Sequence, residues 1–483
     1  MTLITRTVAF LTIIFFSLSA NANNLRIGVS AIGENFDVRY TLDANGYWAL
    51  RLMSFPLLSA VDGQNAAATL INKDDLSYTF KIKDVNFTNG DKLTAQTVKD
   101  IYDDLINNKK VTVYKNSLAN IKSIKVLSEN TIKFTFKKID NFPIAKFTIP
   151  LFKKDGKKMV GLGPYIIDEF KFPYTLKLKS LDNELYYQNI EFVPNSMPVV
   201  RIIKLLKGEI DVLHSGLQAM QVNLLKEKGF DVSASNGANY AYLGFNHKDK
   251  AVGNKLVRKA IAYGLDVDAI VHYLYLDYAE KAGSILDKEH KDYKELMIKR
   301  DIVKATNLLE QAGYKADKNG VRLEIDFSVT TNNQSLRYAQ IVQDQLKDIG
   351  IKVNILTSDW GKFFKDIKSG NVQMYALAWV GIFDGDVYKD LFHSESIKDG
   401  GLNRSFYKNA KMDELTSKVV NSKLTEKQMK DTLFAIQQLQ FDDMIYVPLW
   451  KKQNIVVSRK GIKTYMPTLD GGFDKIKNIK KEK

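Results

Sequence analysis

In the central stretch of the chain, residues 240–275, the spacing of hydrophobic positions changes from two residues to nearly four. Strict alternation over residues 240–245 predicts a strand with one aliphatic face and one aromatic face. A helical period follows, with Asn254 placed to cap a first helix that stops at Gly264. Asp266 is placed to cap a second helix directly afterwards. The stretch therefore predicts one compact unit of a strand followed by two helices.

The same two periods take turns along most of the chain. Period-two segments predict strands at residues 25–29, 78–83, 124–127, 131–136, 176–179, 190–194, 323–329 and 444–450. Helical stripes predict helices at residues 48–57, 95–105, 199–206, 304–312 and in the segment that ends at Gly350. Strands that alternate with helices in this way predict α/β lobes.

Length and composition limit the classes of protein that the chain can represent. Its 483 residues exceed a single ordinary core, and 45% hydrophobic content is typical of a folded protein. The absence of cysteine excludes disulfides, thiolate metal sites and a cysteine nucleophile. The five histidines are scattered without metal-ligand spacing, and no nucleophile elbow occurs. We therefore expect a binding protein without a cofactor, not an enzyme.

The N-terminus predicts export. Arg6 precedes a mostly apolar run over residues 7–20, and Ala20-Asn21-Ala22 gives the small-x-small pattern of a cleavage site. The run is shorter than the ~20 residues that span a membrane. We expect cleavage after Ala22 and a soluble periplasmic protein. The net charge of +15 is spread over interspersed lysines, which favours a solvated surface over a nucleic-acid site.

Several separated motifs carry a family resemblance. They are Gly244-Phe-Asn246, Val257-Arg-Lys-Ala-Ile261 with Asp266, Gly161-Leu-Gly-Pro-Tyr165, Gly208-Glu-Ile-Asp211, and Lys304 to Tyr314. In this order they resemble the family 5 extracellular solute-binding proteins, the receptors of peptide and nickel ABC importers. The resemblance implies a two-lobed periplasmic binding protein of the large three-domain type, with a hinge between the lobes.

The resemblance also implies where the chain divides. Lobe I is expected to comprise residues 23–47, 162–240 and 455–483. An inserted domain II is expected at residues 48–161, and lobe III at residues 241–454. The two lobes are expected to close around a ligand.

The same resemblance points to a ligand-binding segment. Trp379 corresponds to a tryptophan beside which peptide receptors of the family bind their ligand as an added strand. In those receptors an aspartate three residues later binds the ligand's α-ammonium, but this chain has Ile382 there. The nearest acids are Asp384 and, second, Asp386.

The remaining expected contacts come from the same segment and from the central strand. They are Ala378 and Val380 beside the tryptophan, and Tyr240 and Tyr242, for which a wall of the ligand site and a place in the sheet core are equally good interpretations.

The expected function is that of a monomeric receptor that binds oligopeptides or peptide-like solutes and delivers them to an inner-membrane ABC permease. Two alternatives remain open. One is a receptor for chelated nickel or another non-peptide solute, although five scattered histidines give metal binding little support. The other is a chaperone-like periplasmic binder that has lost transport.

Overall fold

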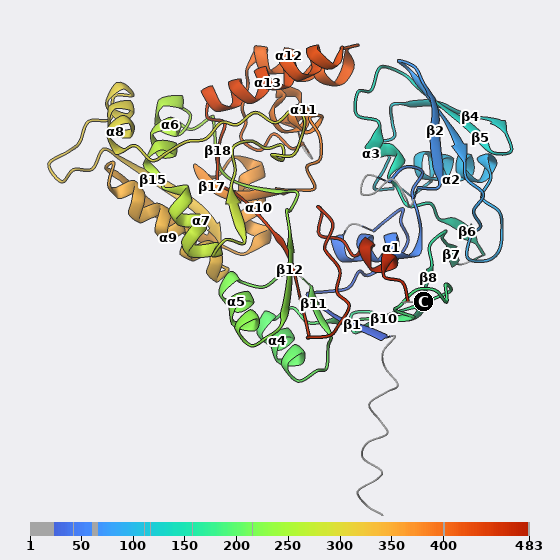
Figure 1. Cartoon of the computed structure of the whole chain (residues 1–483). Helices are drawn as coiled ribbons and strands as arrows, with labels where there is room; N and C mark the ends of the chain where they lie inside the picture. The colour runs from blue at the N-terminus through green and yellow to red at the C-terminus, as the bar shows by residue number, and fades with distance from the viewer. Residues whose placement is uncertain are drawn as a thin grey trace, which may run out of the picture.

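The computed structural model describes residues 24–481 except for residues 42, 60–65, 111, 116, 157, 215 and 399–400. The expected signal peptide and its cleavage site lie outside the described residues. Figure 1 shows two halves, one built around β1, β10 and α1 and the other around β15, β17 and β18.

A seven-stranded sheet forms the base of the first half, in the order β12-β20-β11-β1-β10-β9-β8. Its strands come from three separate parts of the chain. They are β1 (Asn24–Val29), β8 (Tyr165–Lys171), β9 (Thr175–Ser180), β10 (Asn189–Pro194), β11 (Val212–His214), β12 (Asp231–Ser235) and β20 (Asn454–Ser458). β1 runs parallel to both of its neighbours, β10 and β11. Helices α4 (Pro198–Leu206) and α5 (Ala219–Glu227) belong to the same half, and η2 (Asp474–Asn478) lies near the C-terminus.

A four-stranded antiparallel sheet with the order β2-β3-β5-β4 is inserted into this half. Its strands are β2 (Ala68–Lys73), β3 (Ser77–Ile82), β4 (Ile121–Ser128) and β5 (Thr131–Phe136). Around it lie α2 (Ala95–Asn107), α3 (Ile144–Phe147) and the hairpin of β6 (Lys153–Asp155) and β7 (Lys158–Val160), whereas α1 (Ala44–Met53) contacts β8 and η2. The predicted cap Thr94 is confirmed, since its side chain accepts a hydrogen bond from the Thr97 amide at 3.2 Å.

The glycines of the Gly-x-Gly-Pro segment have a packing role. A Cβ atom on Gly163 would lie 2.6 Å from the carbonyl oxygen of Leu52, closer than any side chain allows. The Gly163 amide donates to the carbonyl of Met53 at 2.9 Å. The chain therefore returns towards the seven-stranded sheet directly against the end of α1, where only glycine fits. The predicted helix at residues 48–57 also ends here, at Met53, three residues before Pro56.

The second half is a three-layer α/β structure around a five-stranded sheet with the order β16-β15-β17-β13-β18. Its strands are β13 (Asn239–Phe245), β15 (Leu323–Thr330), β16 (Ile351–Ser358), β17 (Met374–Val380) and β18 (Tyr446–Pro448). The aliphatic face packs against α6 (Lys255–Gly264), α7 (Val267–Tyr275), α8 (Ile302–Gln311) and α9 (Asn333–Lys347). The predicted caps are confirmed: Asn254 accepts from the Leu256 amide and Asp266 from the Ala269 amide, both at 2.9 Å.

We call the opposite, aromatic side of this sheet the inner face. It carries Tyr240, Tyr242, Tyr375, Trp379 and Tyr446 and packs against four helices. These are α10 (Trp360–Ser369), α11 (Val387–Phe392), α12 (Ala410–Asn421) and α13 (Glu426–Asp442), with the short η1 (Ser394–Ser396) between α11 and α12. Figure 1 shows α10 and α11 between the sheet and the other half of the molecule.

Two chain crossings join the halves, one between β12 and β13 and one between β19 (Trp450–Lys452) and β20. β19 itself pairs with β14 (Ala279–Lys281), so the predicted strand at residues 444–450 is divided between two sheets. The Asn239 side chain donates to the Lys452 carbonyl at 3.0 Å and accepts from the Lys452 amide at 2.8 Å. The two crossings are therefore bonded to each other.

The inserted domain also touches the inner face directly. The Asn141 side-chain amide donates to the carbonyl oxygens of Val419 and Ser422, at 2.7 and 2.9 Å, at the C-terminal end of α12. Next to it, Phe142 is only 8% exposed and belongs to the hydrophobic cluster of the inner face. These contacts hold the two halves together at a point far along the chain from the crossings.

We expect Phe142→Ala to shift the protein towards a more open arrangement. The apolar contact it removes is worth about 2 kcal/mol, which changes a closed-to-open ratio by roughly 30-fold. Small-angle scattering would measure this as an increased radius of gyration. Leu127→Ala, at a side chain 56% exposed on the same domain, is the control and should leave the radius unchanged. Equal radii for all three proteins would contradict the interpretation.

Candidate functional site

Strand β17 has one paired edge and one free edge over its second half. β15 pairs with β17 only at Met374 and Tyr375, whereas β13 follows it as far as Val380. Among the described residues, no strand pairs with the other edge of residues 376–380. The Gly381 amide donates to the Ala238 carbonyl at 2.7 Å, which fixes the alternation of the antiparallel ladder. The main-chain N–H and C=O groups of Ala378 and Val380 therefore point to the free edge.

The side chains along this edge leave it accessible. Val380 is 74% exposed, and Ala378 is also exposed. Ile382, which follows the strand, is 8% exposed and packs into the cluster of the inner face. The position where relatives are expected to carry an ammonium-binding aspartate is thus a buried aliphatic side chain.

Trp379 lies on the inner face at the hinge end of the sheet. Its indole is 9% exposed and stacks on the ring of Tyr242, with centroids 6.0 Å apart and planes within 9°. The guanidinium carbon of Arg404 lies over the indole, 4.2 Å from its centroid. The tryptophan is therefore covered by a cation and contributes little surface of its own.

Tyr240 and Tyr242 do not form walls of a site in this structure. Both side chains are completely buried, because β13 is a central strand covered by helices on both faces. Burial raises the pKa of both phenols well above the usual value near 10. In this structure both rings belong to the sheet core, and their contact with a ligand stays a prediction.

Several polar atoms of the inner face are enclosed without a hydrogen-bond partner among the described residues. They are the hydroxyls of Tyr240, Tyr242, Tyr375 and Tyr446 and the indole Nε1 of Trp379. Such groups are costly to bury unpaired. The polar neighbours of these groups are mostly one another, with the side chains of Gln440 and Ser405, so they form one polar cluster within the core.

The two candidate acids differ in environment. The Asp384 side chain is 42% exposed, lies 3.3 Å from Nε2 of His290 and accepts from the Gly385 amide at 2.8 Å. Burial, with a smaller contribution from the charge of Asp384, raises the pKa of Asp386 to about 7, although Lys146 of the inserted domain lowers it. Both acids are partly exposed, but Asp384 already has partners and Asp386 lies in surroundings that disfavour its charged form.

Arg404 is the site residue that sequence reasoning missed. It follows Asn403, which is 3% exposed and whose amide donates to the carbonyls of His393 and Tyr407 at 3.2 and 2.9 Å. No motif marks Arg404, and Trp379 precedes it by 25 residues. Its position follows from the fold of this loop, which is fixed by buried hydrogen bonds.

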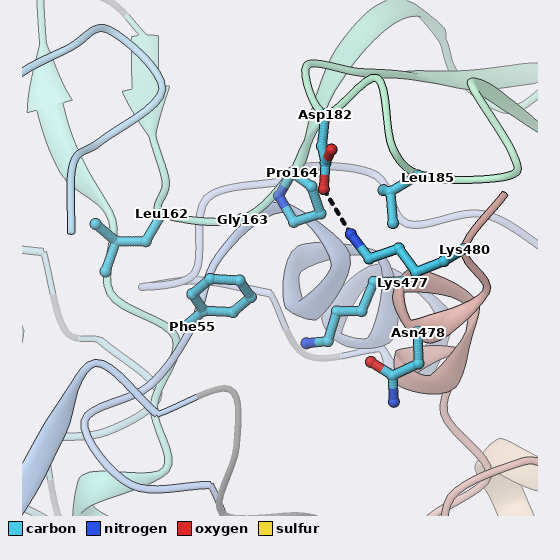
Figure 2. A pocket seen from close by; sticks show the side chains of 9 residues that line it. All are labelled: Phe55, Leu162, Gly163, Pro164, Asp182, Leu185, Lys477, Asn478 and Lys480. Atoms are coloured by element: carbon cyan, nitrogen blue, oxygen red, sulfur yellow. Dashed lines mark hydrogen bonds and ion pairs between the residues drawn. The ribbon is translucent and has the colours of Figure 1, made fainter. Parts of the chain in front are cut away.

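Two hollows lie away from this segment. The first, of about 580 Å³, lies beside the Gly-x-Gly-Pro crossover and contains the ion pair of Asp182 and Lys480 at 2.9 Å (Figure 2). The second, of about 790 Å³, lies on the seven-stranded sheet near Asp211, which Arg26 and Arg459 contact. Neither is lined by any predicted site residue.

Within the described part of the chain, no group of three or more histidine, aspartate or glutamate side chains is arranged to hold a metal ion. In the same residues, no helix has the length and apolar character needed to cross a bilayer.

We expect Asp386→Asn to stabilise the protein at pH 8 but not at pH 4. The folded-state pKa lies above the unfolded value near 3.9, so the buried carboxyl destabilises the fold increasingly as the pH rises from about 4 to 7. The gain in free energy of unfolding at pH 8 should be about 2–4 kcal/mol by urea denaturation. Asp268→Asn, at a side chain 67% exposed, is the control. The same change at both pH values would show that Asp386 is ionised throughout.

The sequence of this chain is similar to those of known solute-binding proteins. The family profile described as "Bacterial extracellular solute-binding proteins, family 5 Middle" matches residues 62–398. Di/tripeptide-binding protein 1 of Pseudomonas aeruginosa is 25% identical over 286 residues, which span 54% of this chain and about half, 53%, of that protein. Oligopeptide-binding protein AppA of Bacillus subtilis is 26% identical over 436 residues, 81% of this chain and 78% of the relative.

The solved structure of NikA from Brucella suis in complex with Fe(III)-EDTA is similar in fold, with a TM-score of 0.83 at 19% identity. The similarity covers 95% of this chain and 100% of that one. The predicted two-lobed α/β fold is therefore confirmed. Since the family profile matches well over half of its length, this chain belongs to the bacterial extracellular solute-binding proteins of family 5.

Proposed function

We propose that this protein is the receptor of an ABC importer and binds a peptide or peptide-like solute along the free edge of β17. The single observation that carries the proposal is the accessible main chain of Ala378 and Val380, next to the crossings that join the two halves. A ligand in extended conformation would add a strand there and pair with the N–H and C=O groups that β15 leaves free.

Main-chain pairing suits a receptor of broad specificity, because every peptide offers the same donors and acceptors at the same spacing. The names of the relatives fit this mode, since they include a di/tripeptide-binding and an oligopeptide-binding protein. Trp379 and Ile382 would support the pairing segment from the core behind it, with Asp384 as the partner of an ammonium group if the ligand carries one.

The proposal also covers the processing, location and oligomeric state of the protein. The signal peptide is removed after Ala22, and the mature chain works as a periplasmic monomer that delivers its ligand to an inner-membrane permease. It binds without catalysis. The division into lobe I, domain II and lobe III at the residues given above is supported by the way the strands sort into three large sheets.

We expect N-methylation of one pairing amide in a bound peptide to weaken binding by about tenfold or more, because the peptide loses its N–H donor and a carbonyl acceptor of β17 is left unpaired. The peptide would be identified by native mass spectrometry of the protein purified from the periplasm, and affinity would be measured by calorimetry. Methylation of the neighbouring amide, which faces away from β17, is the matched control. Equal affinity for all three peptides would overturn strand addition.

Purification with a chelated metal and no peptide would instead support the alternative solute class. In that case Trp379→Phe should still change the affinity, because the indole supports the binding segment whatever the solute. No effect of this conservative change on any ligand would remove the segment from the site.

A further inference from the structure

We propose that Arg404 makes the part of the site beside Trp379 a receptor for a carboxylate of the ligand. The inference rests on the proposed function and assigns the charge of the ligand group that lies there. It reverses the expectation that this place holds an ammonium group.

Arg404 lies in a row of aromatic side chains. The guanidinium carbon lies 4.2 Å from the ring centroid of Trp379 and 4.7 Å from that of Phe364. Phe364 in turn stacks on Trp360, with centroids 5.4 Å apart and planes within 13°. At the other end Trp379 stacks on Tyr242. The cation therefore lies close to two rings. The row of side chains begins at Trp360, which is 59% exposed, and ends in the core.

Stacking of this kind fixes the plane of the guanidinium and leaves its edge free. The five N–H donors of an arginine point outward in its plane, and two rings lie within 5 Å of the guanidinium carbon here. Among the described residues, no carboxylate lies within ion-pair distance of Arg404, and its side chain donates no hydrogen bond. The residue is half-buried, so its charge is partly withdrawn from water. A partly desolvated cation without an anion is what a carboxylate of a ligand would complete.

The backbone around Arg404 is rigid enough to hold this position. The Asn403 side-chain oxygen accepts from the Tyr407 amide at 3.2 Å and from the Ser405 hydroxyl at 3.1 Å. The Ser405 carbonyl accepts from the His247 amide at 2.9 Å, which ties the loop to the end of β13. Little conformational entropy is then lost when a ligand binds.

The surrounding charges favour an anion as well. The charge of Arg404 reaches the phenols of Tyr242, Tyr375 and Tyr446, which are enclosed in the core. Ile382 supplies no charge to compete with it. Asp384 is engaged by His290 and by a main-chain amide. The positive charge beside Trp379 is thus not neutralised by the protein itself.

A carboxylate can come from the end of a peptide or from an acidic side chain, and the fork of the guanidinium can donate two hydrogen bonds to either of them. Tri-alanine, its C-terminal amide, and an amidated peptide with a central glutamate separate these sources. Calorimetry with the mature full-length protein would measure all three. We expect tri-alanine or the glutamate peptide to bind at least tenfold more tightly than the neutral amide.

The decisive variant is Arg404→Gln, which keeps a flat polar group and removes the charge. The substitution should weaken binding of the preferred acid by about 10- to 100-fold and leave the affinity for the amide nearly unchanged. Lys248→Gln is the matched control, because Lys248 also stacks on a ring of this loop, 4.0 Å from the centroid of Phe406, and should have no effect on either ligand.

The outcomes separate the two claims. If Arg404→Gln weakens acid and amide equally, or neither, carboxylate recognition is overturned while peptide binding stands. If the wild-type protein binds none of the three peptides, the proposed function fails and this inference with it. Thermal melting of Arg404→Gln should match that of the wild-type protein. Higher salt should weaken binding of the acid to the wild-type protein and have little effect on the variant.

Discussion

The antiparallel pairing of β13 with β17, from Asn239 with Val380 to Phe245 with Met374, is the constraint on which the candidate site depends. It holds β17 at the centre of a sheet whose first strand comes directly from a crossing between the halves. It also occupies one edge of β17, so that the edge left free beyond β15 begins next to that crossing. The same register places Trp379 opposite Tyr240 and turns both to the inner face.

The aromatic inner face explains why one side of this sheet differs from the other. The aliphatic side packs against four helices as an ordinary core, although it also encloses the Tyr338 hydroxyl and the Trp450 indole nitrogen. The inner side differs in its stacked rings: Tyr242 stacks on Tyr446, with centroids 4.1 Å apart, and on Trp379. Rings give large buried area and a flat surface, and they allow a cation such as Arg404 to be held at the edge of a core. An aliphatic face would also give a large buried area, but it would not hold a cation.

The fold was predictable to a large extent because its signals are local. Alternation predicted β13, and capping residues such as Asn254 and Asp266 predicted helix starts, each over a few neighbouring positions. The site was less predictable from the sequence. Alternation says that Tyr240 and Tyr242 share a face, but whether helices cover that face depends on segments more than a hundred residues away. Arg404 gives no local signal, since its stacking partners come from α10 and β17.

The central claim is that a ligand pairs with the free edge of β17. Hydrogen exchange measured at single amides tests this most directly. Residues 377 and 379 donate towards β13 and should exchange slowly with or without ligand. The amides of Ala378 and Val380 should exchange quickly in the free protein and become protected when the ligand is bound. Protection of these two amides alone would support the account. Unchanged exchange at Ala378 and Val380 in a saturated complex would contradict it.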